Sequence, residues 1–313
     1  MIQDLLLQSF FVPLWLISLG IPILFVGILI AISTITVNLI KKDYRKEISK
    51  LSLKLEDKRR HWSKAKKDTL RKLNHILIFT GLLVVWYIGL FLANIYTGTS
   101  AGMIPEENNM LLLYLRIFNN PNSISQVLFS LGWFYYILFF FFYIMFLFMI
   151  SNEFARKSKK IYFPFTFFTR IYLSEKERQN YGTYLYFSIG QTFAAFVCPP
   201  MVFFMILGTG SISDLMASQI GIRFGKRNIK WNQNKTWEGT IAGSLITLIL
   251  GFLFVGIYWS VIFTLVFLLI DISTDKPLDI SDNLLIPVVF SLIYLSIRFF
   301  FNFDYYTILI FWI

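Results

Sequence analysis

The chain has 313 residues, of which 56% are hydrophobic, 19% aromatic and 15% charged, and its mean hydropathy is +0.63. Soluble domains are about 25% charged, so the composition excludes an ordinary water-soluble enzyme, and the aromatic content excludes a disordered chain. With Cys198 as its one cysteine and only two histidines, the sequence supports neither a disulfide scaffold nor a His/Cys zinc site. We therefore expect an integral membrane protein with a net charge of +11.

Long apolar runs follow one another along the chain, at residues 10–40, 76–97, 125–150, 183–212, 240–270 and 284–313. A helix needs about 20 apolar residues to cross the hydrocarbon core of a bilayer. The runs are continuous and do not alternate with period two, which indicates helices rather than strands. The first run has neither a basic flank before it nor a cleavage site after it, so we expect it to be a permanent span.

The positive charge is concentrated in segments between the runs: 41–75 carries +9, 152–181 carries +4 and 213–238 carries +3. The positive-inside rule places these three segments in the cytoplasm. Segment 41–75 also has the apolar periodicity of an amphipathic helix. It is either a connector that fixes topology or a helix that lies on anionic headgroups.

Two of the apolar runs contain features that break a helix. Pro199 and Pro200 are adjacent and remove two backbone donors, so we expect a short hairpin of spans 183–198 and 200–220, the alternative being a single kinked span. The run 240–270 allows a second break near Gly256. With both breaks, segments 213–238 and 271–283 lie on the same side of the membrane and can build one site. The sequence thus predicts an all-α, polytopic membrane protein of about eight transmembrane helices, some of them in short hairpins.

The densest polar cluster begins at Asp214, which lies among small residues. Five cations and a second acid follow it: Arg223, Lys226, Arg227, Lys230, Lys235 and Glu238. Carboxylates bind Mg²⁺ through oxygen, and Lys and Arg neutralise phosphates, so the mixture suits a nucleoside triphosphate with a divalent metal. The alternative is a loop that is basic for topology and rich in small residues for helix packing.

Three pieces of this region, in order, resemble the signature of the membrane CTP-transferase superfamily, which includes dolichol, phytol and CTP-dependent diacylglycerol kinases and phosphatidate cytidylyltransferase. They are Asp214…Ala217…Gly221, then Phe224-Gly225-Lys226, then Lys235-Thr236-Trp237-Glu238-Gly239-Thr240. The later Asp282-Asn283-Leu284…Pro287 resembles the kinase branch. The cytidylyltransferase signature contains a histidine, and no histidine follows His75. Ser213 stands where the kinases usually have glycine.

The resemblance implies a CTP-dependent kinase that transfers the γ-phosphate to the hydroxyl of a lipid such as a polyprenol or diacylglycerol, with Mg²⁺ as cofactor. It implies Asp214 and Asp282 as metal ligands and Glu238 or Asp271 as the acceptor of the hydroxyl proton. It also implies a set of nucleotide-binding residues: Arg223, Lys226, Lys235, Thr236 and Asn283.

Two other functions stay open at this point: a phosphatidate cytidylyltransferase that forms a CDP-lipid, and a non-catalytic membrane scaffold. We expect an N-terminal transmembrane region over 1–180 and a catalytic membrane core over 181–313, with the active site facing the cytoplasm. The expected partners are a membrane lipid and CTP, without nucleic acid. Preference for CTP over ATP, and a homodimer as opposed to a monomer, are left open.

Overall fold

A computed structural model describes residues 2–39, 50, 61–97, 109–119, 132–158, 161–163, 166, 173, 177, 180–274, 278 and 280–306. Within these residues, six helical segments are long and apolar enough to cross a membrane: Leu19–Leu39, Asp68–Leu92, Ile137–Lys157, Pro200–Phe224, Trp237–Val255 and Asp282–Phe301. The prediction of an all-α polytopic membrane protein is therefore confirmed. Most of the predicted amphipathic helix 41–75 lies outside the described residues.

The contacts divide the chain into two compact units, and each unit consists of two separate stretches of the sequence. The first comprises 1–63 and 141–188, with helix α1 (Ile2–Leu39) and most of α6 (Gly132–Lys157). Its buried Glu153 pairs with Arg156 at 2.6 Å and accepts a hydrogen bond from the backbone N–H of Gly182. The boundary at 180/181 between an N-terminal region and a catalytic core stays a prediction.

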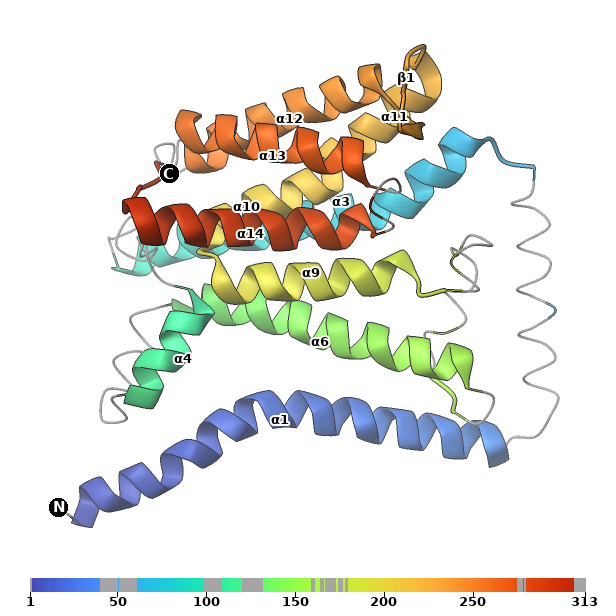
Figure 1. Cartoon of the computed structure of the whole chain (residues 1–313). Helices are drawn as coiled ribbons and strands as arrows, with labels where there is room; N and C mark the ends of the chain where they lie inside the picture. The colour runs from blue at the N-terminus through green and yellow to red at the C-terminus, as the bar shows by residue number, and fades with distance from the viewer. Residues whose placement is uncertain are drawn as a thin grey trace. The chain divides into compact units, whose positions relative to one another are not determined.

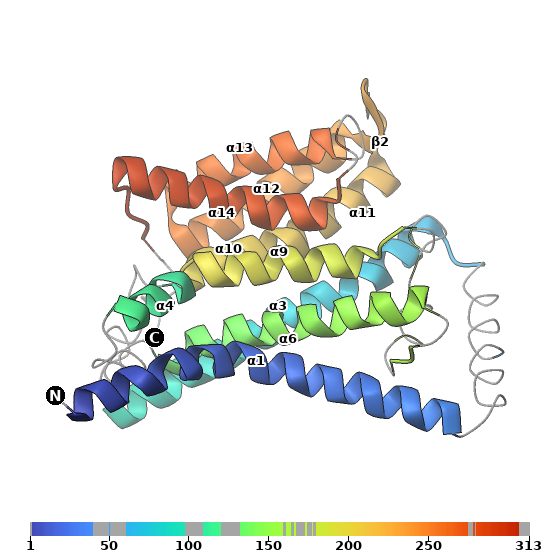
Figure 2. The ribbon, with the colours of Figure 1, turned by 60° about the horizontal axis from the view of Figure 1, so that its bottom comes forward.

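The second unit comprises 64–140 and 189–313 and contains every residue discussed below. Its helices are shown in Figures 1 and 2. They are α3 (Lys64–Thr97), α4 (Met110–Asn119), the greater part of α9 (Thr183–Val197), α10 (Pro200–Gly208), the π-helix η3 (Thr209–Ser213), α11 (Asp214–Phe224), α12 (Trp237–Val255), α13 (Ile257–Ser273) and α14 (Asp282–Phe301). Strands β1 (Asn228–Ile229) and β2 (Asn232–Thr236) form a small antiparallel hairpin between α11 and α12.

Both predicted breaks are present. Helix α9 ends at Val197, and α10 begins at Pro200 after an extended Pro199, so the two helices run in opposite directions (Figures 1 and 2). Between α12 and α13, Gly256 has a φ of +85°, which only glycine adopts readily. With 15 and 17 residues, α9 and α13 are the short helices of these two hairpins.

Small residues let the helices of the second unit approach closely. A Cβ at Gly251 of α12 would lie 2.7 Å from the Cα of Ser260 on α13. A Cβ at Gly239 would collide with the carbonyl oxygen of Ala217 on α11. Close approach of this kind is how helices associate within a membrane. It brings the end of α11, the start of α12 and the end of α13 together at one end of the unit.

Stacked aromatic rings set the position of α14 against α13. Phe263 and Phe290 stack with their centroids 4.8 Å apart, and Trp259 lies 5.2 Å from Tyr294. Aromatic pairs of this geometry add about 1 kcal/mol each beyond the area that they bury. The first turn of α14 consequently lies beside the last turn of α13, and the polar ends of the two helices meet.

Candidate functional site

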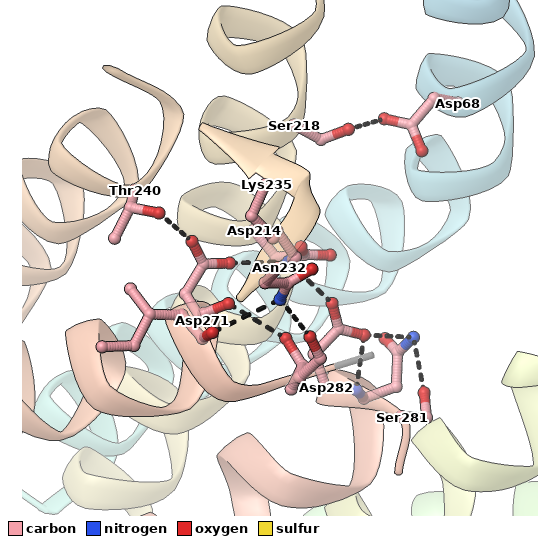
Figure 3. A network of polar contacts seen from close by, with 12 residues as sticks. Asp68, Asp214, Ser218, Asn232, Lys235, Thr240, Asp271, Ser281 and Asp282 are labelled. Atoms are coloured by element: carbon pink, nitrogen blue, oxygen red, sulfur yellow. Dashed lines mark hydrogen bonds and ion pairs between the residues drawn. The ribbon is translucent and has the colours of Figure 1, made fainter. Parts of the chain in front are cut away.

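The site is centred on Lys235, the penultimate residue of β2. Its Nζ lies 2.7 Å from Oδ1 of Asp271, in the last turn of α13, and 3.5 Å from Oδ2 of Asp282, the first residue of α14. Figure 3 shows these side chains converging from three elements, with Asp214 beside them. The predicted meeting of segments 213–238 and 271–283 at one end of the helices is therefore confirmed.

The charge of Lys235 is held in place by its surroundings. Burial by itself lowers the pKa of this amine, but the carboxylates of Asp271, Asp282 and Asp214, in that order of strength, outweigh it and raise the pKa above the ordinary value of 10.5. Lys235 is thus a permanent cation among three acids. A cation in that position can bind a phosphate group without taking up a proton.

Asp271 is 3% exposed and is oriented by two donors. Its Oδ1 pairs with Lys235, and its Oδ2 accepts a hydrogen bond of 2.5 Å from the hydroxyl of Thr240, in the first turns of α12. The buried Asn232 of β2 donates through Nδ2 to the carbonyl oxygens of Ile272 and Thr274, which ties the strand to the end of α13. These bonds fix the distance between Lys235 and Asp271.

Asp214 begins α11 and is 4% exposed. Lys72 of α3, itself only 6% exposed, lies 2.8 Å from Oδ2 of Asp214 and donates to its carbonyl oxygen at 2.9 Å. One turn away on α3, Asp68 accepts a hydrogen bond of 2.6 Å from Ser218 of α11 (Figure 3). The two contacts bind the start of α3 to α11.

The sequence reasoning missed Lys72 and Asp68, because it assigned them to the basic connector 41–75. The sequence does contain a pattern that marks these two residues as candidates. The two residues are four apart, so they share a helix face, and they open an apolar run in which ionisable residues are costly and usually functional.

Asn283 follows Asp282 in the first turn of α14. Its backbone N–H donates to Oδ1 of Asp282 at 2.9 Å, and its side chain is directed to the same oxygen at 3.4 Å. Asp282 also lies at the N-terminus of α14, where the helix dipole favours a negative charge. With a side chain 25% exposed, Asp282 is the most accessible of the three carboxylates.

Four other predicted residues have local roles at the edge of this cluster. Thr236 caps α12 by accepting a hydrogen bond of 3.3 Å from the N–H of Gly239. Glu238 accepts from the backbone N–H groups of Lys226 and Arg227, and so closes the turn before β1. The side chain of Lys226 is exposed on that turn, and the side chain of Arg223 is exposed in the last turn of α11.

Mg²⁺ binds oxygen ligands, which the acidic side chains of this cluster supply. In the described part of the chain, no three His, Cys, Asp or Glu side chains lie close enough together to hold a metal ion unaided. Mg²⁺ is usually held by one or two carboxylates together with substrate phosphates and water. The oxygen ligands of Asp282 and Asp214 fit that pattern, although Asp214 shares its carboxylate with Lys72.

No family model, curated protein or solved structure matches this chain. The geometry itself therefore carries the functional argument. Three carboxylates, the buried Lys72 and the partly exposed Lys235 meet where β2 and helices α3, α11, α13 and α14 come together, and the two cations of this grouping can bind phosphate oxygens.

Proposed function

We propose that the chain is an integral-membrane, CTP-dependent lipid kinase that transfers a phosphoryl group to a lipid hydroxyl, with its site at the cytoplasmic face. One observation carries the proposal: Lys235 is bonded to Asp271 and lies beside Asp282 and Asp214. These residues come from separate parts of the resemblance to the CTP-transferase superfamily, and they meet in one place. An ordinary topology-fixing loop has no need for three acids around one partly buried cation.

Each group has a role that its position supports. The triphosphate oxygens bind to Lys235 within the cluster and to Arg223 and Lys226 at its exposed rim. Asp282 and Asp214 would hold Mg²⁺, which when bound neutralises charge on the phosphates. Asn283 holds the carboxylate of Asp282 in place through its backbone N–H.

In the proposed reaction, the lipid hydroxyl oxygen forms a bond to the γ-phosphorus of CTP. The bond between that phosphorus and the oxygen bridging to the β-phosphate breaks, and CDP leaves with the electron pair. The hydroxyl proton passes to Asp271, whose carboxylate is oriented by Lys235 and Thr240. Positioning and charge neutralisation account for most of the catalysis in phosphoryl transfer, and the cluster supplies both.

Asp271 suits the proton acceptor better than Glu238 does. Glu238 is engaged by backbone N–H groups on an exposed turn. Asp271 is buried within the cluster and bonded to Lys235.

The position of a radioactive label in CTP tests the proposal. The purified protein is incubated with Mg²⁺ and CTP labelled at either the α- or the γ-phosphate, together with a polyprenol, diacylglycerol or phosphatidate. We expect γ-label in the lipid product. Transfer of α-label to phosphatidate would instead identify a cytidylyltransferase, and no transfer together with no Mg²⁺-dependent CTP binding would identify a scaffold. Parallel reactions with γ-labelled ATP establish the nucleotide preference.

A further inference from the structure

A second group of polar side chains lies buried near the carboxylates but has unpaired atoms. In the described part of the chain, the buried polar atoms that make no hydrogen bond include both amide atoms of Gln191 and the hydroxyls of Ser211, Ser213 and Ser244. Gln191, Ser211 and Ser213 are fully buried, and Ser244 is 7% exposed. An unpaired polar group inside a membrane protein is costly, so this set, which we name the polar layer, requires a partner.

The polar layer lies next to the carboxylates. Ser244 follows Thr240, which binds Asp271, by four residues along α12. On η3, Gly210 precedes Asp214 by the same four residues. Four residues of helix correspond to about 6 Å. Ser244 is thus about one helical turn farther along α12 than Thr240, whereas Ser211 and Ser213 directly precede Asp214, so the polar layer adjoins the reacting groups.

Gln191 can be placed beside η3 from its neighbours. A Cβ on Gly190 would lie 3.0 Å from the carbonyl oxygen of Asn283, so this part of α9 is packed against the first turns of α14. On the other side, the amide nitrogen of Gln191 lies 3.5 Å from the position of a Cβ on Gly210, which is an ordinary van der Waals distance. A side chain at position 210 would therefore contact the unpaired amide.

The helix at Gly210 is also irregular. Residues Thr209–Ser213 form a π-helix between α10 and α11. Short π-helical segments inside α-helices are frequent at functional sites. Here the segment presents Ser211, Gly210 and Ser213 immediately before Asp214.

We infer that the polar layer is a second subsite, which hydrogen-bonds a non-reacting oxygen of the lipid acceptor, and that the acceptor is an ester-bearing lipid alcohol such as a diacylglycerol. The inference rests on the proposed function. An amide and three hydroxyls donate and accept without charge, which suits the carbonyl oxygen of an ester rather than a phosphate. A polyprenol has only hydrocarbon below its hydroxyl and would leave Gln191 unpaired, and sites built to hydrogen-bond a substrate discriminate strongly against analogues without that group.

The test compares two acceptors that differ only at the proposed contact. Diacylglycerol and its dialkyl ether analogue share the reacting hydroxyl and the chains, but the ether has no carbonyl groups. With γ-labelled CTP and the full-length protein in nanodiscs, we expect kcat/KM for the ester to exceed that for the ether about tenfold. Gln191→Leu should bring this ratio close to one. Gly210→Ala should do the same, because its methyl fits at an ordinary contact distance but occupies the space beside the amide.

Two matched variants serve as controls. Thr247→Val removes a buried hydroxyl that is already bonded within its own helix, and Gly81→Ala adds a methyl to a membrane helix where nothing lies within 4 Å. Both should keep the wild-type ratio. Equal use of ester and ether by the wild-type protein, or a ratio unchanged in both Gln191→Leu and Gly210→Ala, would overturn the subsite.

Binding of labelled diacylglycerol separates the two proposals. If no γ-label reaches any lipid, the kinase proposal fails, and competition between the ester and the ether for binding still reports on the polar layer. A preference for the ester that is lost in Gln191→Leu and kept in Thr247→Val would retain the subsite. No preference in the wild-type protein would overturn it.

Discussion

Lys72 and Asp214 form a buried ion pair, with Nζ 2.8 Å from Oδ2, although 142 residues of sequence separate them. The pair joins α3 to the start of α11 and sets the position of one of the three carboxylates. It also means that the charge on Asp214 is balanced without a metal ion. Removal of either partner leaves the other buried with a weaker ionic contact only, which for Lys72 is Asp68 at 3.9 Å and for Asp214 is the charge of Lys235.

Lys72→Met should therefore destabilise the protein by about 3–5 kcal/mol, as is typical when one partner of a buried ion pair is removed. Thermal unfolding in detergent measures the effect. The control is Lys230→Met, because Lys230 is exposed and should be neutral. The double variant Lys72→Met, Asp214→Asn should recover most of the loss. If Lys72→Met and Lys230→Met unfold at the same temperature, the pair does not stabilise the fold.

How far the sequence predicts the site depends on whether its signals are local. Pro199-Pro200 and Gly256 break helices by their own backbone chemistry, so both hairpins, and with them the meeting of Lys235 and Asp271, were predictable. The pairing of Lys72 with Asp214 depends on how α3 packs, which no local pattern reports. Conversely, Thr236 and Glu238 belong to the motif that suggested nucleotide-binding and catalytic roles. In the structure, Thr236 caps a helix and Glu238 closes a turn.

The close approach of α11 and α12 predicts a specific sensitivity at Gly239. A methyl group there would collide with the backbone carbonyl of Ala217, which cannot move without shifting the helix. Gly239→Ala should lower the unfolding temperature. It should also lower the free energy of unfolding by about 1–3 kcal/mol, which is the usual effect of overpacking. Gly81→Ala, with open space around it, is the matched control and should be neutral. Equal stability of the two variants would contradict the packing described.

Metal dependence should be traceable to Asp282. If CTP binds together with Mg²⁺ held by this carboxylate, chelation of the metal should abolish CTP binding, and restoring Mg²⁺ should recover it. Asp282→Asn should raise the Mg²⁺ concentration needed for CTP binding at least tenfold, measured by titration of labelled CTP. Asp304→Asn changes an exposed acid beyond the other end of α14 and should bind as the wild type does. An unchanged Mg²⁺ requirement in Asp282→Asn would remove Asp282 from the metal site.

The raised pKa of Lys235 predicts a flat pH response. Because the folded-state pKa lies above the ordinary value of 10.5, the stability contributed by its charge is fully present below that value. It is lost only as pH rises through the folded-state pKa. From about pH 6 to about pH 9, the difference in unfolding temperature between the wild type and Lys235→Met should stay constant. A difference that shrinks across this range would show that Lys235 loses its proton there.

Thr240 tests whether the orientation of Asp271 matters for turnover. Thr240 is 1% exposed, and its hydroxyl donates to Asp271 at 2.5 Å. Hydrogen bonds to charged groups contribute about 1.5–3 kcal/mol. Thr240→Val keeps the shape of the side chain but leaves Asp271 with one donor fewer. We expect kcat to fall at least tenfold with little change in the KM for CTP, because Lys235 remains to bind the triphosphate. Thr240→Ser restores a hydroxyl and should recover most of the rate.

The matched control for this change is Thr247→Val, which removes a hydroxyl from the same helix that bonds only to the carbonyl of Gly243. It should leave kcat unchanged. A fall in kcat that is equal in the two valine variants would reflect a general loss of packing in α12. A higher KM for CTP with unchanged kcat in Thr240→Val would place Asp271 in nucleotide binding and not at the hydroxyl proton. Only a fall in kcat specific to Thr240→Val agrees with Asp271 as the proton acceptor.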